Sequence, residues 1–445
     1  MLKWLTSAAT FRSRPTVGRS YWQRRAATPE NGDVSTFIDQ AAWRAKVDYV
    51  VVGGGFAGLM TSIRLAEAEP AAEIVVLEAQ FAGFGASGRN AGLVSPLPAP
   101  MWLVTAESNA EHAWALTELN KSTHRLSQWL SNHAPTSEVR PATLRIEASG
   151  RITAAGLGRV ARALEFCRIE HRLLYNPSAR SPLVIEVPTQ TLNPFGTVQG
   201  LTAYARQLGV DVREGAPVSL INDGNSGVDV TLGDGRTVHA RAVVVATNAY
   251  TDSVRMPGRV RAKVMHNYMV ATLELSNEVL AQLPAGEPFV VELNRAYVYY
   301  RLHKRRLIYG GIDKFAQSGD DFTVPAAVLA QLERLMDRTV PGTRLEAAYA
   351  WGGKYHLTRT ELPQIERTGS SGSIIMNVGY GGTGVALTMI CAKLAASLAR
   401  TGQIEDLDDR RLLAAIDQTR LPVKAGLRLV GGVAADLLLP KKGER

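Results

Sequence analysis

Residues 47–58, VDYVVVGGGFAG, decide the fold of this chain. The first half, 47–52, is mostly apolar and β-branched, which is typical of a buried parallel strand. The second half follows without a break and matches the pattern G-x-G-x-x-G at Gly53, Gly55 and Gly58. The strand and the glycines together predict a tight turn that leads directly into a helix.

The residues that follow complete a strand, turn, helix and strand in that order. Residues 59–69 are rich in Ala, Leu, Met and Glu and predict a helix, and 73–77 (EIVVL) predict a second buried strand. That strand ends at Glu78, 20 positions after Gly58. Glycines at these spacings allow the turn, the approach of a pyrophosphate and close helix packing, while the acid can accept hydrogen bonds from a ribose. The unit predicts a dinucleotide site rather than an ordinary βαβ turn.

The bulk composition indicates a globular protein of two domains. At 445 residues the chain exceeds the usual size of a single hydrophobic core. It is 46% hydrophobic and 20% charged, and no stretch has the apolar length of a membrane span. The formal net charge of +9 comes from dispersed basic residues, which favours a surface suited to anionic cofactors or substrates over nucleic-acid binding.

Cysteine and histidine usage argues against a metal site. Cys167 and Cys391 lie far apart and outside any Cys/His cluster, and the eight histidines show no metal-ligand spacing. We expect both cysteines in the core of a protein from a reducing compartment, and we predict a cytoplasmic location.

The N-terminal segment allows two interpretations. Residues 1–29 contain six basic residues and one cluster of aromatic side chains but no acid before Glu30, a composition that resembles a transit peptide. In that case the protein would be organellar. We favour a surface arm that docks through Ser20, Tyr21 and Trp22.

Two further glycine-rich segments can approach a flat ring. Residues 81–96, FAGFGASGRNAGLVSP, offer Ser87 and Asn90 as donors and Arg89 as a cation, although a plain surface loop is the alternative. Residues 374–384, IIMNVGYGGTG, predict a strand and a turn before the apolar helix 385–400. The start of that helix can stabilise negative charge on a bound ring.

Between these motifs the pattern changes along the chain. Apolar spacing predicts helices near 102–132, 154–170, 192–209 and 321–338. Residues 227–232 and 237–240 predict a hairpin around Asp234-Gly235, followed by a separate buried strand, 241–247. Alternating strands over 262–312 predict an antiparallel sheet.

The chain resembles the flavin-dependent amine and amino-acid oxidoreductases of the D-amino-acid oxidase superfamily, in the γ-glutamylputrescine-oxidase-like branch. The matching motifs run in order over most of the chain: VVVGGGFAGL, VLEAQ, GFGASGRNAGLVSP, the block from VDVREG to RAVVVATNAYTD, WGG at 351–353 and NVGYGGTGVALT. Many FAD and NAD proteins share the first motif, whereas ASGRNAG and GYGGTG are much more selective. The resemblance implies FAD as the cofactor and a small-molecule amine or amino acid as the substrate, with oxygen or another acceptor reoxidising the flavin.

The resemblance also implies an α/β fold, in which a discontinuous Rossmann-type FAD-binding domain joins a second, mainly antiparallel-sheet α+β substrate domain. We predict a basic arm over 1–45 and a C-terminal tail over 421–445. The FAD-binding domain is expected over 46–100, 186–255 and 345–420, and the substrate domain over 101–185 and 256–344.

The cofactor contacts implied by the resemblance fall on small residues and exposed backbone. They are Gly53, Gly55, Phe56, Ala57 and Gly58 for the pyrophosphate; Glu78 for the adenosine ribose; Ser87, Gly88, Arg89, Asn90 and Gly92 for the ribityl chain and flavin; Val218 for adenine; Thr247 near the pyrophosphate; and Gly381, Gly382, Thr383 and Gly384 for the pyrimidine end of the ring. Relatives with covalent flavin use a His in the first loop or a late Cys. The first loop here has Arg89 and Asn90 instead, and we expect non-covalent FAD.

The predicted chemistry is oxidation of a C–N bond, in which a hydride equivalent moves to flavin N5 and the resulting imine hydrolyses. Arg301 is a candidate clamp for a substrate carboxylate, with a surface or interdomain salt bridge as the alternative. Tyr299 and Tyr297 share its strand face and can line the pocket or the core. Lys263 and His266 lie where some relatives place residues above the flavin.

Two other functions stay open at this point. An NAD-linked Rossmann dehydrogenase would leave ASGRNAG and GYGGTG without a role. A flavin-binding subunit without turnover would hold a flavin that no amine reduces.

Overall fold

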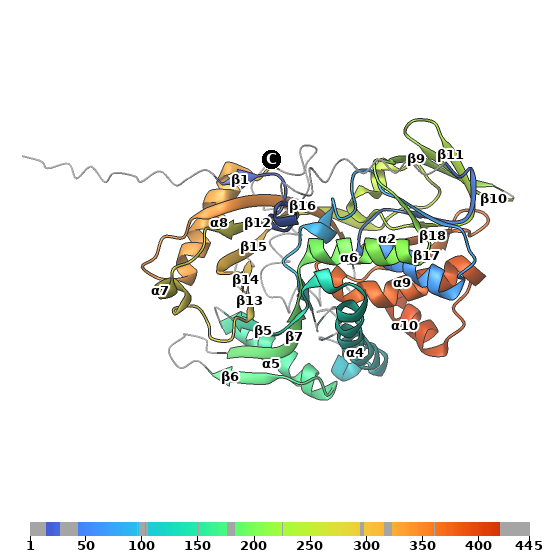
Figure 1. Ribbon diagram of the computed structural model, residues 1–445. Helices are drawn as coiled ribbons and strands as arrows, with labels where there is room; N and C mark the ends of the chain where they lie inside the picture. The colour runs from blue at the N-terminus through green and yellow to red at the C-terminus, as the bar shows by residue number, and fades with distance from the viewer. Residues whose placement is uncertain are drawn as a thin grey trace, which may run out of the picture.

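The computed structural model describes residues 15–26, 43–95, 97, 103, 106–148, 151–175, 183–224, 226–293, 298–315, 323–359 and 361–418. Two β-sheets lie side by side in this part of the chain, one surrounded by long helices and the other strongly curved (Figure 1).

The first sheet has the order β17-β18-β11-β2-β3-β8, with β10 and β9 continuing from β11. Its central strands from β18 to β8 pair in parallel, as expected for a chain of βαβ crossovers. The strands are β2 Lys46–Val52, β3 Ile74–Leu77, β8 Asp211–Arg213, β9 Val218–Gly224, β10 Gly227–Leu232, β11 Thr237–Val245, β17 Gln364–Thr368 and β18 Ile374–Val378.

One strand prediction in this sheet is wrong. Residues 237–240 and 241–247 were expected to form two strands, but β11 is continuous from Thr237 to Val245. Its first half pairs antiparallel with β10 and its second half pairs in parallel with β18. A single extended strand can hydrogen-bond to different partners along its length, so the change of partner did not require a break at Arg241.

The helices around this sheet follow the apolar periodicity of the sequence. Helix α9 packs against α2 and α4, which explains why its surface is apolar nearly all round. The helices are α2 Phe56–Ala68, α4 Ala110–His133, α6 Pro194–Gln207, α9 Gly384–Thr401 and α10 Leu407–Gln418, with short 3₁₀ turns η1 Ala86–Gly88, η2 Ala106–Ser108, η3 Pro135–Ser137 and η4 Asn248–Ser253.

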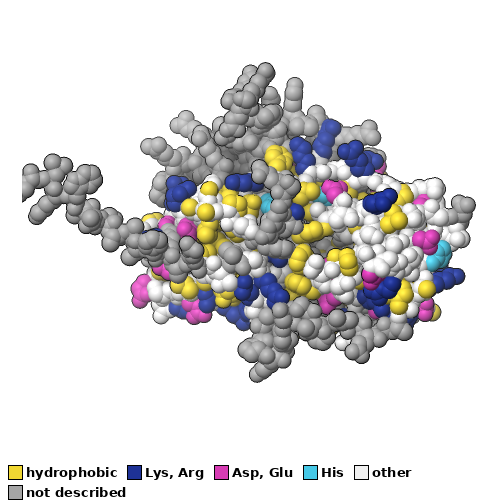
Figure 2. All heavy atoms as spheres, turned by 90° about the horizontal axis from the view of Figure 1, so that it is seen from above, with side chains coloured by type: hydrophobic (Ala, Val, Ile, Leu, Met, Phe, Trp, Pro, Cys, Tyr) yellow, Lys and Arg dark blue, Asp and Glu magenta, His cyan; other side chains and the backbone are white. Residues whose placement is uncertain are grey.

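By length and composition alone, α9 could cross a membrane, and it is the one such helix among the described residues. Within the protein, 56% of this stretch is buried, as in the core helix of a globular protein. In Figure 2, the described part of the upper face carries basic side chains in several separate places, interspersed with acidic and apolar ones.

The second sheet has the order β1-β16-β12-β15-β14-β13-β5-β7-β4, and β6 pairs with β7. Most neighbours are antiparallel, as predicted, but β1 with β16 and β13 with β5 are parallel. The strands are β1 Thr16–Val17, β4 Leu93–Val94, β5 Arg140–Ala148, β6 Arg172–Tyr175, β7 Leu183–Thr191, β12 Ala262–Thr272, β13 Phe289–Leu293, β14 Val298–His303, β15 Arg306–Phe315 and β16 Ala347–Thr358. The remaining helices are α1 Tyr21–Ala26, α5 Arg151–Phe166, α7 Asn277–Leu280 and α8 Ala326–Thr339.

Strand β16 pairs with the second sheet, whereas the sequence suggested that it belongs to the FAD-binding domain. Residues 345–420 were assigned to the FAD-binding domain, yet β16 pairs along its whole length with β12 in the second sheet. A strand is assigned by its hydrogen-bonded neighbour, and the sequence of 347–358 does not identify that neighbour. By strand pairing, the chain returns to the first sheet only at β17. The predicted tail, 421–445, lies outside the described residues.

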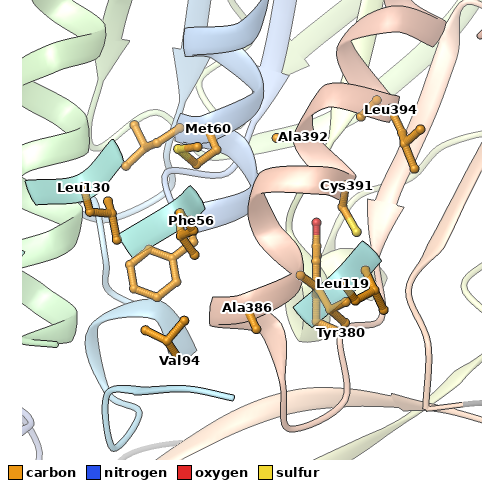
Figure 3. Close-up of a cluster of buried hydrophobic side chains, with 14 of the residues drawn as sticks. Phe56, Met60, Val94, Leu119, Leu130, Tyr380, Ala386, Cys391, Ala392 and Leu394 are labelled. Carbon is orange, nitrogen blue, oxygen red and sulfur yellow. The ribbon is translucent and has the colours of Figure 1, made fainter. Parts of the chain in front are cut away.

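A single apolar cluster joins the two sheets. Leu59 and Tyr49 of the first domain belong to the same buried cluster as Met269 and Trp351 of the second sheet. Figure 3 shows part of this cluster, where Phe56 of α2 lies near Val94 and where Tyr380 stands beside α9. The opposite face of the second sheet packs separately, against α8. The region between the sheets is therefore formed by one face of each.

Candidate active site

The glycines of the first turn are packed too closely to carry side chains. A Cβ atom on Gly58 would lie 1.9 Å from the carbonyl oxygen of Gly53, and one on Gly55 would lie 2.9 Å from the Ser87 hydroxyl. Gly53 has a φ of +110°, which disfavours any residue with a Cβ. The turn therefore requires all three glycines for its own packing.

The start of helix α2 suits an anion. Its N-cap is Gly55, so no side chain caps the first turn, and only the Phe56 N–H bonds to a nearby hydroxyl, Ser87 Oγ at 2.9 Å. Phe56 is buried and Ala57 is partly exposed. Backbone N–H groups at a helix start carry partial positive charge. This glycine-lined, uncapped turn fits a pyrophosphate.

Glu78 lies where the ribose acid was expected, at the end of β3. Its carboxylate accepts hydrogen bonds from the N–H groups of Gly54, at 2.7 Å, and Gln80, at 3.0 Å. Burial raises the pKa of Glu78 above its ordinary value, although these N–H groups oppose the shift. The Ala216 N–H donates to the Glu78 carbonyl, which places the segment that leads to Val218 beside this acid.

The loop 83–92, here called the ASGRNAG loop, holds its shape through internal contacts. The Asn90 side chain donates to the carbonyls of Ala86 and Ser87 and accepts from the Gly92 N–H. A Cβ on Gly88 would lie 2.1 Å from the Gly83 carbonyl, and one on Gly92 would lie 2.2 Å from the Leu192 carbonyl. The side chain of Asn90 and the two glycines thus fix the backbone that was expected to lie along the flavin.

Arg89 was expected to be a cation along the phosphate tail, but its guanidinium is hydrogen-bonded to backbone carbonyls of the protein instead. The side chain is 4% exposed. Its Nε donates to the Phe84 carbonyl, and Nη1 donates to the carbonyls of Gly18 and Gly352. These contacts favour a structural role, in which Arg89 joins the ASGRNAG loop to β16 and to the N-terminal segment.

The second glycine-rich turn, 379–384, connects to the first through η4. The Gly379 N–H donates to Asn248 Oδ1 at 3.0 Å. Thr247, the residue before Asn248, lies next to the first turn, because a Cβ on Gly53 would lie 3.4 Å from the Thr247 backbone nitrogen. Both turns are therefore positioned by the same short segment.

The residues of the second turn leave space on one side. Gly381 has a φ of +58° and its N–H donates to the His356 carbonyl at 3.0 Å. A Cβ on Gly382 would meet no atom within 4 Å. Thr383 is the N-cap of α9, and Gly384 is its first residue. This open start of a long helix can accept the edge of a ring that carries negative charge.

The N-terminal segment 18–26 packs on the ASGRNAG loop, as the docked-arm prediction required for Ser20, Tyr21 and Trp22. Ser20 Oγ donates to the Gly88 carbonyl at 2.7 Å, and Trp22 Nε1 donates to the Asn90 carbonyl at 2.9 Å. Gln23 Nε2 donates to the Gly83 carbonyl at 2.9 Å. Three backbone carbonyls of the loop are thus bonded by side chains of residues 20–23. The sequence did not indicate which surface would receive it.

Arg301, the predicted carboxylate clamp, lies beneath this segment. Its Cζ is 4.9 Å from the centre of the Trp22 ring, and Nη2 donates to the Leu192 carbonyl at 2.7 Å. The side chain is 4% exposed, and burial lowers its pKa to about 9. Its Nε has no hydrogen-bond partner in the described part of the chain. These contacts favour a role in holding Trp22 over contact with a substrate.

The other predicted substrate residues lie on different faces of the second sheet. Tyr299 packs on the cluster shared with the first domain and stacks on Phe289. His266 is buried beside Tyr268, which packs on the α8 side. Lys263 is exposed, with Nζ 4.9 Å from the Phe315 ring centre. Tyr297 lies outside the described residues.

Sequence reasoning missed three polar residues next to Tyr299. Tyr299 Oη donates to Asn267 Oδ1 at 2.5 Å, Asn267 Nδ2 donates to Asp313 Oδ1 at 2.7 Å, and Tyr355 also bonds to Asp313. The available signal was the occurrence of polar residues at inward positions of otherwise apolar strands. Within the described ranges, no group of three or more His, Cys, Asp or Glu is arranged to hold a metal ion.

Cys391 lies inside α9, and its side chain is hydrogen-bonded to Tyr380 of the predicted flavin turn. The thiol is buried, and burial raises its pKa to about 12. Figure 3 shows the Tyr380 hydroxyl directed toward Cys391, and that hydroxyl also donates to Asn377 Oδ1 at 2.5 Å. A protonated, buried thiol is a poor nucleophile.

Comparisons with known proteins find relatives that cover most of the chain. The chain is 28% identical over 374 residues to γ-glutamylputrescine oxidoreductase of Escherichia coli, covering 81% of this chain and 85% of the relative. It is 26% identical over 378 residues to the probable oxidoreductase OrdL of Rhizobium meliloti, covering 82% and 85%. Among solved structures, glycine oxidase from Geobacillus kaustophilus superposes with a TM-score of 0.69 at 18% identity, covering 85% of this chain and all of that one.

The L-proline dehydrogenase of P. horikoshii has a similar fold, with a TM-score of 0.67 at 17% identity and coverage of 82% and 96%. A family model described as FAD dependent oxidoreductase matches residues 48–398, which is most of the chain. The predicted cofactor, FAD, the two-domain α/β fold and the enzyme class are confirmed, and the family favours FAD over the NAD alternative. This chain belongs to the family of FAD-dependent oxidoreductases.

Proposed function

We propose that this enzyme oxidises the C–N bond of a small amine or amino acid with non-covalently bound FAD. The main support is that Thr247 and Asn248 connect the two glycine-rich turns. The turns place two helix starts where one elongated anionic cofactor can contact both. The names of γ-glutamylputrescine oxidoreductase, glycine oxidase and L-proline dehydrogenase support an amine or amino acid as the substrate.

In this proposal, FAD lies from β9 across the first turn to the start of α9. Val218 contacts the adenine and Glu78 the ribose, on neighbouring segments. The residues that hold the remaining cofactor atoms are Gly53, Gly55, Phe56, Ala57, Gly58, Thr247, Ser87, Gly88, Asn90, Gly92, Gly381, Gly382, Thr383 and Gly384. Arg89 supports the backbone of its own loop through three carbonyl bonds.

FAD supplies the two-electron oxidation when it is bound. The protein residues orient the substrate, exclude water and stabilise charge. The start of α9, with Thr383 as N-cap, stabilises the negative charge that develops at the pyrimidine end. The apolar cluster shared by the two sheets keeps water from the region between them.

The substrate lies against the face of the second sheet that carries Tyr299. Of the four residues proposed from sequence, Tyr299 keeps this role. Arg301 is covered by Trp22, His266 lies on the α8 face and Lys263 is exposed, so their catalytic roles have less support than that of Tyr299. We also propose a division into two domains, with β16 counted in the substrate domain. We further propose that the protein is cytoplasmic and that oxygen or another small acceptor reoxidises the flavin.

The first test is a visible absorption spectrum of the purified protein, followed by acid precipitation. We expect a yellow protein that releases its flavin into the supernatant, because the buried, protonated Cys391 cannot serve as a covalent link. Colour that stays in the pellet would contradict the non-covalent proposal.

An amine and amino-acid panel without oxygen then tests the reaction. Bleaching of the flavin band by at least one compound supports C–N oxidation. A flavin that none of them reduces, but that dithionite does reduce, would instead favour a flavin-binding subunit without turnover.

A further inference from the structure

Four polar side chains are connected across the face of the second sheet that packs toward the first. Asp313 on β15 is hydrogen-bonded to the Asn267 amide on β12 and to the Tyr355 hydroxyl on β16, and Tyr299 on β14 joins the network through Asn267. All four side chains are partly buried. Tyr299 packs against the cluster shared by both sheets, which fixes the face on which this network lies.

The network lies between the two segments proposed to hold the flavin. Along β16, Gly353 pairs with Asn267, and a Cβ on Gly353 would lie 3.5 Å from the Arg89 side chain. Two residues further, Tyr355 precedes His356, whose carbonyl accepts the Gly381 N–H. The ASGRNAG loop and the second turn thus approach β16 on either side of Tyr355, next to Asp313.

Asp313 has no cationic partner among the described residues. Its two hydrogen-bond partners, Asn267 and Tyr355, are both neutral. A carboxylate removed from water without a counter-ion is strongly unfavourable. A ligand that carries a positive charge would offset this free-energy penalty by pairing with the carboxylate.

The backbone beside Asp313 is also strained. Ile312 has a φ of +61°, a conformation that β-branched residues rarely adopt, and the pairing of β12 with β15 shifts register at this point. Such strain persists where the surrounding structure enforces it and occurs preferentially at functional sites. The irregularity immediately precedes Asp313, which is hydrogen-bonded to Asn267 and Tyr355.

This face offers more to a cation than to a carboxylate. Arg301 lies beneath Trp22, and Lys263 is exposed at the end of β12. We propose that Asp313 binds a second, non-reacting ammonium group of the substrate, an inference that rests on the proposed amine oxidation. The preferred substrates are then alkyl diamines and related polyamines rather than amino acids.

The test compares three compounds with the same four-carbon chain, 1,4-diaminobutane, butylamine and 4-aminobutanoate, which differ only at the far end. We expect the KM of the FAD-loaded enzyme for the diamine to be about 10-fold below that for butylamine, with 4-aminobutanoate poorest, because a charged hydrogen bond is worth roughly this factor or more. Titration calorimetry of the FAD-free protein should show the same order of affinity.

The decisive variant is Asp313→Asn, which removes the charge and keeps the shape. We expect it to lose the preference for the diamine about 10-fold through KM, with kcat changed much less. Its thermal stability should change little, because the partly buried carboxylate that is replaced has no counter-ion among the described residues. Asp229→Asn is the matched control, since Asp229 lies on β10 in the first sheet with half its side chain exposed, and should change nothing.

The diamine preference should also depend on pH. Burial raises the pKa of Asp313 to about 6, so the carboxylate is charged above this pH and neutral below it. The KM for 1,4-diaminobutane should therefore rise toward that for butylamine as the pH falls through 6. In the described part of the chain, the titratable groups bonded to Asp313 directly or through Asn267 are Tyr355 and Tyr299.

Equal KM values for the diamine and butylamine, or an unchanged preference in Asp313→Asn, would overturn the inference while leaving amine oxidation intact. Failure of every amine to reduce the flavin would instead overturn the proposed function. Should Asp313→Asn not fold, Tyr355→Phe, which removes one hydrogen bond to the carboxylate, must weaken the diamine preference for the inference to stand.

Discussion

The two faces that meet in the candidate active site are built in different ways. On the first sheet, the anion-binding turn uses Gly53, Gly55 and Gly58 with Glu78 at the next strand end, all within one βαβ unit. On the second sheet, the polar network takes one residue from each of four strands, from Asn267 on β12 to Tyr355 on β16.

The difference reflects which atoms do the binding. In the proposed function, the first face binds through backbone N–H groups and the absence of side chains, so the required spacing is local in sequence. The second face is proposed to bind through side chains whose partners are set by strand pairing and by the register shift near Ile312. A backbone site tolerates little variation, whereas a side-chain site can change specificity without altering the fold.

The largest effect is expected for Gly58→Ala, which tests whether the first face depends on packing alone. The new Cβ would lie 1.9 Å from the Gly53 carbonyl, so the helix must move away from the strand. We expect a loss of ~3 kcal/mol or more in the free energy of unfolding of the FAD-free protein, measured in urea.

The matched control is Gly158→Ala in α5, where a Cβ meets no atom within 4 Å. It should be neutral or stabilising by up to about 1 kcal/mol. A Gly58→Ala protein as stable as its parent would show that the turn can relax and that local packing does not define this face.

A similarly large effect is expected for Trp22→Ala, which tests whether the N-terminal segment belongs to the first face. The ring is 1% exposed, its Nε1 holds the Asn90 carbonyl and it covers Arg301. Removing a buried Trp of this kind costs ~3–5 kcal/mol. The FAD dissociation constant, measured by flavin fluorescence, should also rise, because the ASGRNAG loop loses its support.

Trp114→Ala serves as the comparison, since Trp114 is a partly buried residue of α4 that stacks on Arg411. It should lower stability less and leave FAD affinity unchanged. Equal FAD affinity in Trp22→Ala and the parent would separate the N-terminal segment from the cofactor site.

The smallest effect is expected for Gly382→Ala, which distinguishes ligand space from packing space. In the protein alone a Cβ at this position meets nothing within 4 Å, so the stability of the FAD-free form should not change. If the flavin ring occupies the open side of this turn, FAD binding should weaken about 10-fold, or ~1.4 kcal/mol. Unchanged FAD affinity would place the ring elsewhere.

The local parts of the site were predictable from the sequence because their chemistry is a matter of spacing. The glycine pattern and Glu78 predicted the first turn, and ASGRNAG and GYGGTG predicted two further flavin segments. The family assignment confirms that the cofactor is FAD. The docking of Ser20, Tyr21 and Trp22 was also anticipated, without the surface that receives them.

The predictions that depended on distant partners were less successful. Residue type and strand parity suggested Arg301 as a clamp, yet its partner is a tryptophan 279 positions earlier in the chain. His266 falls on the α8 face because strand pairing, which the sequence does not specify, fixes which side of β12 it occupies. For the same reason, the sequence did not indicate that β16 pairs with β12.

The sequence by itself determined that this protein has a glycine-lined dinucleotide turn and an FAD-dependent oxidoreductase fold, since backbone conformation and helix starts follow from residues close together in the chain. Only the tertiary structure decided that Asp313, which has no cationic partner in the described ranges, lies between the two segments proposed to hold the flavin, and that Arg89 and Arg301 contact the N-terminal segment. The physical reason is that a charge acquires its role from the groups around it in space, and strand pairing brings those groups from all parts of the chain.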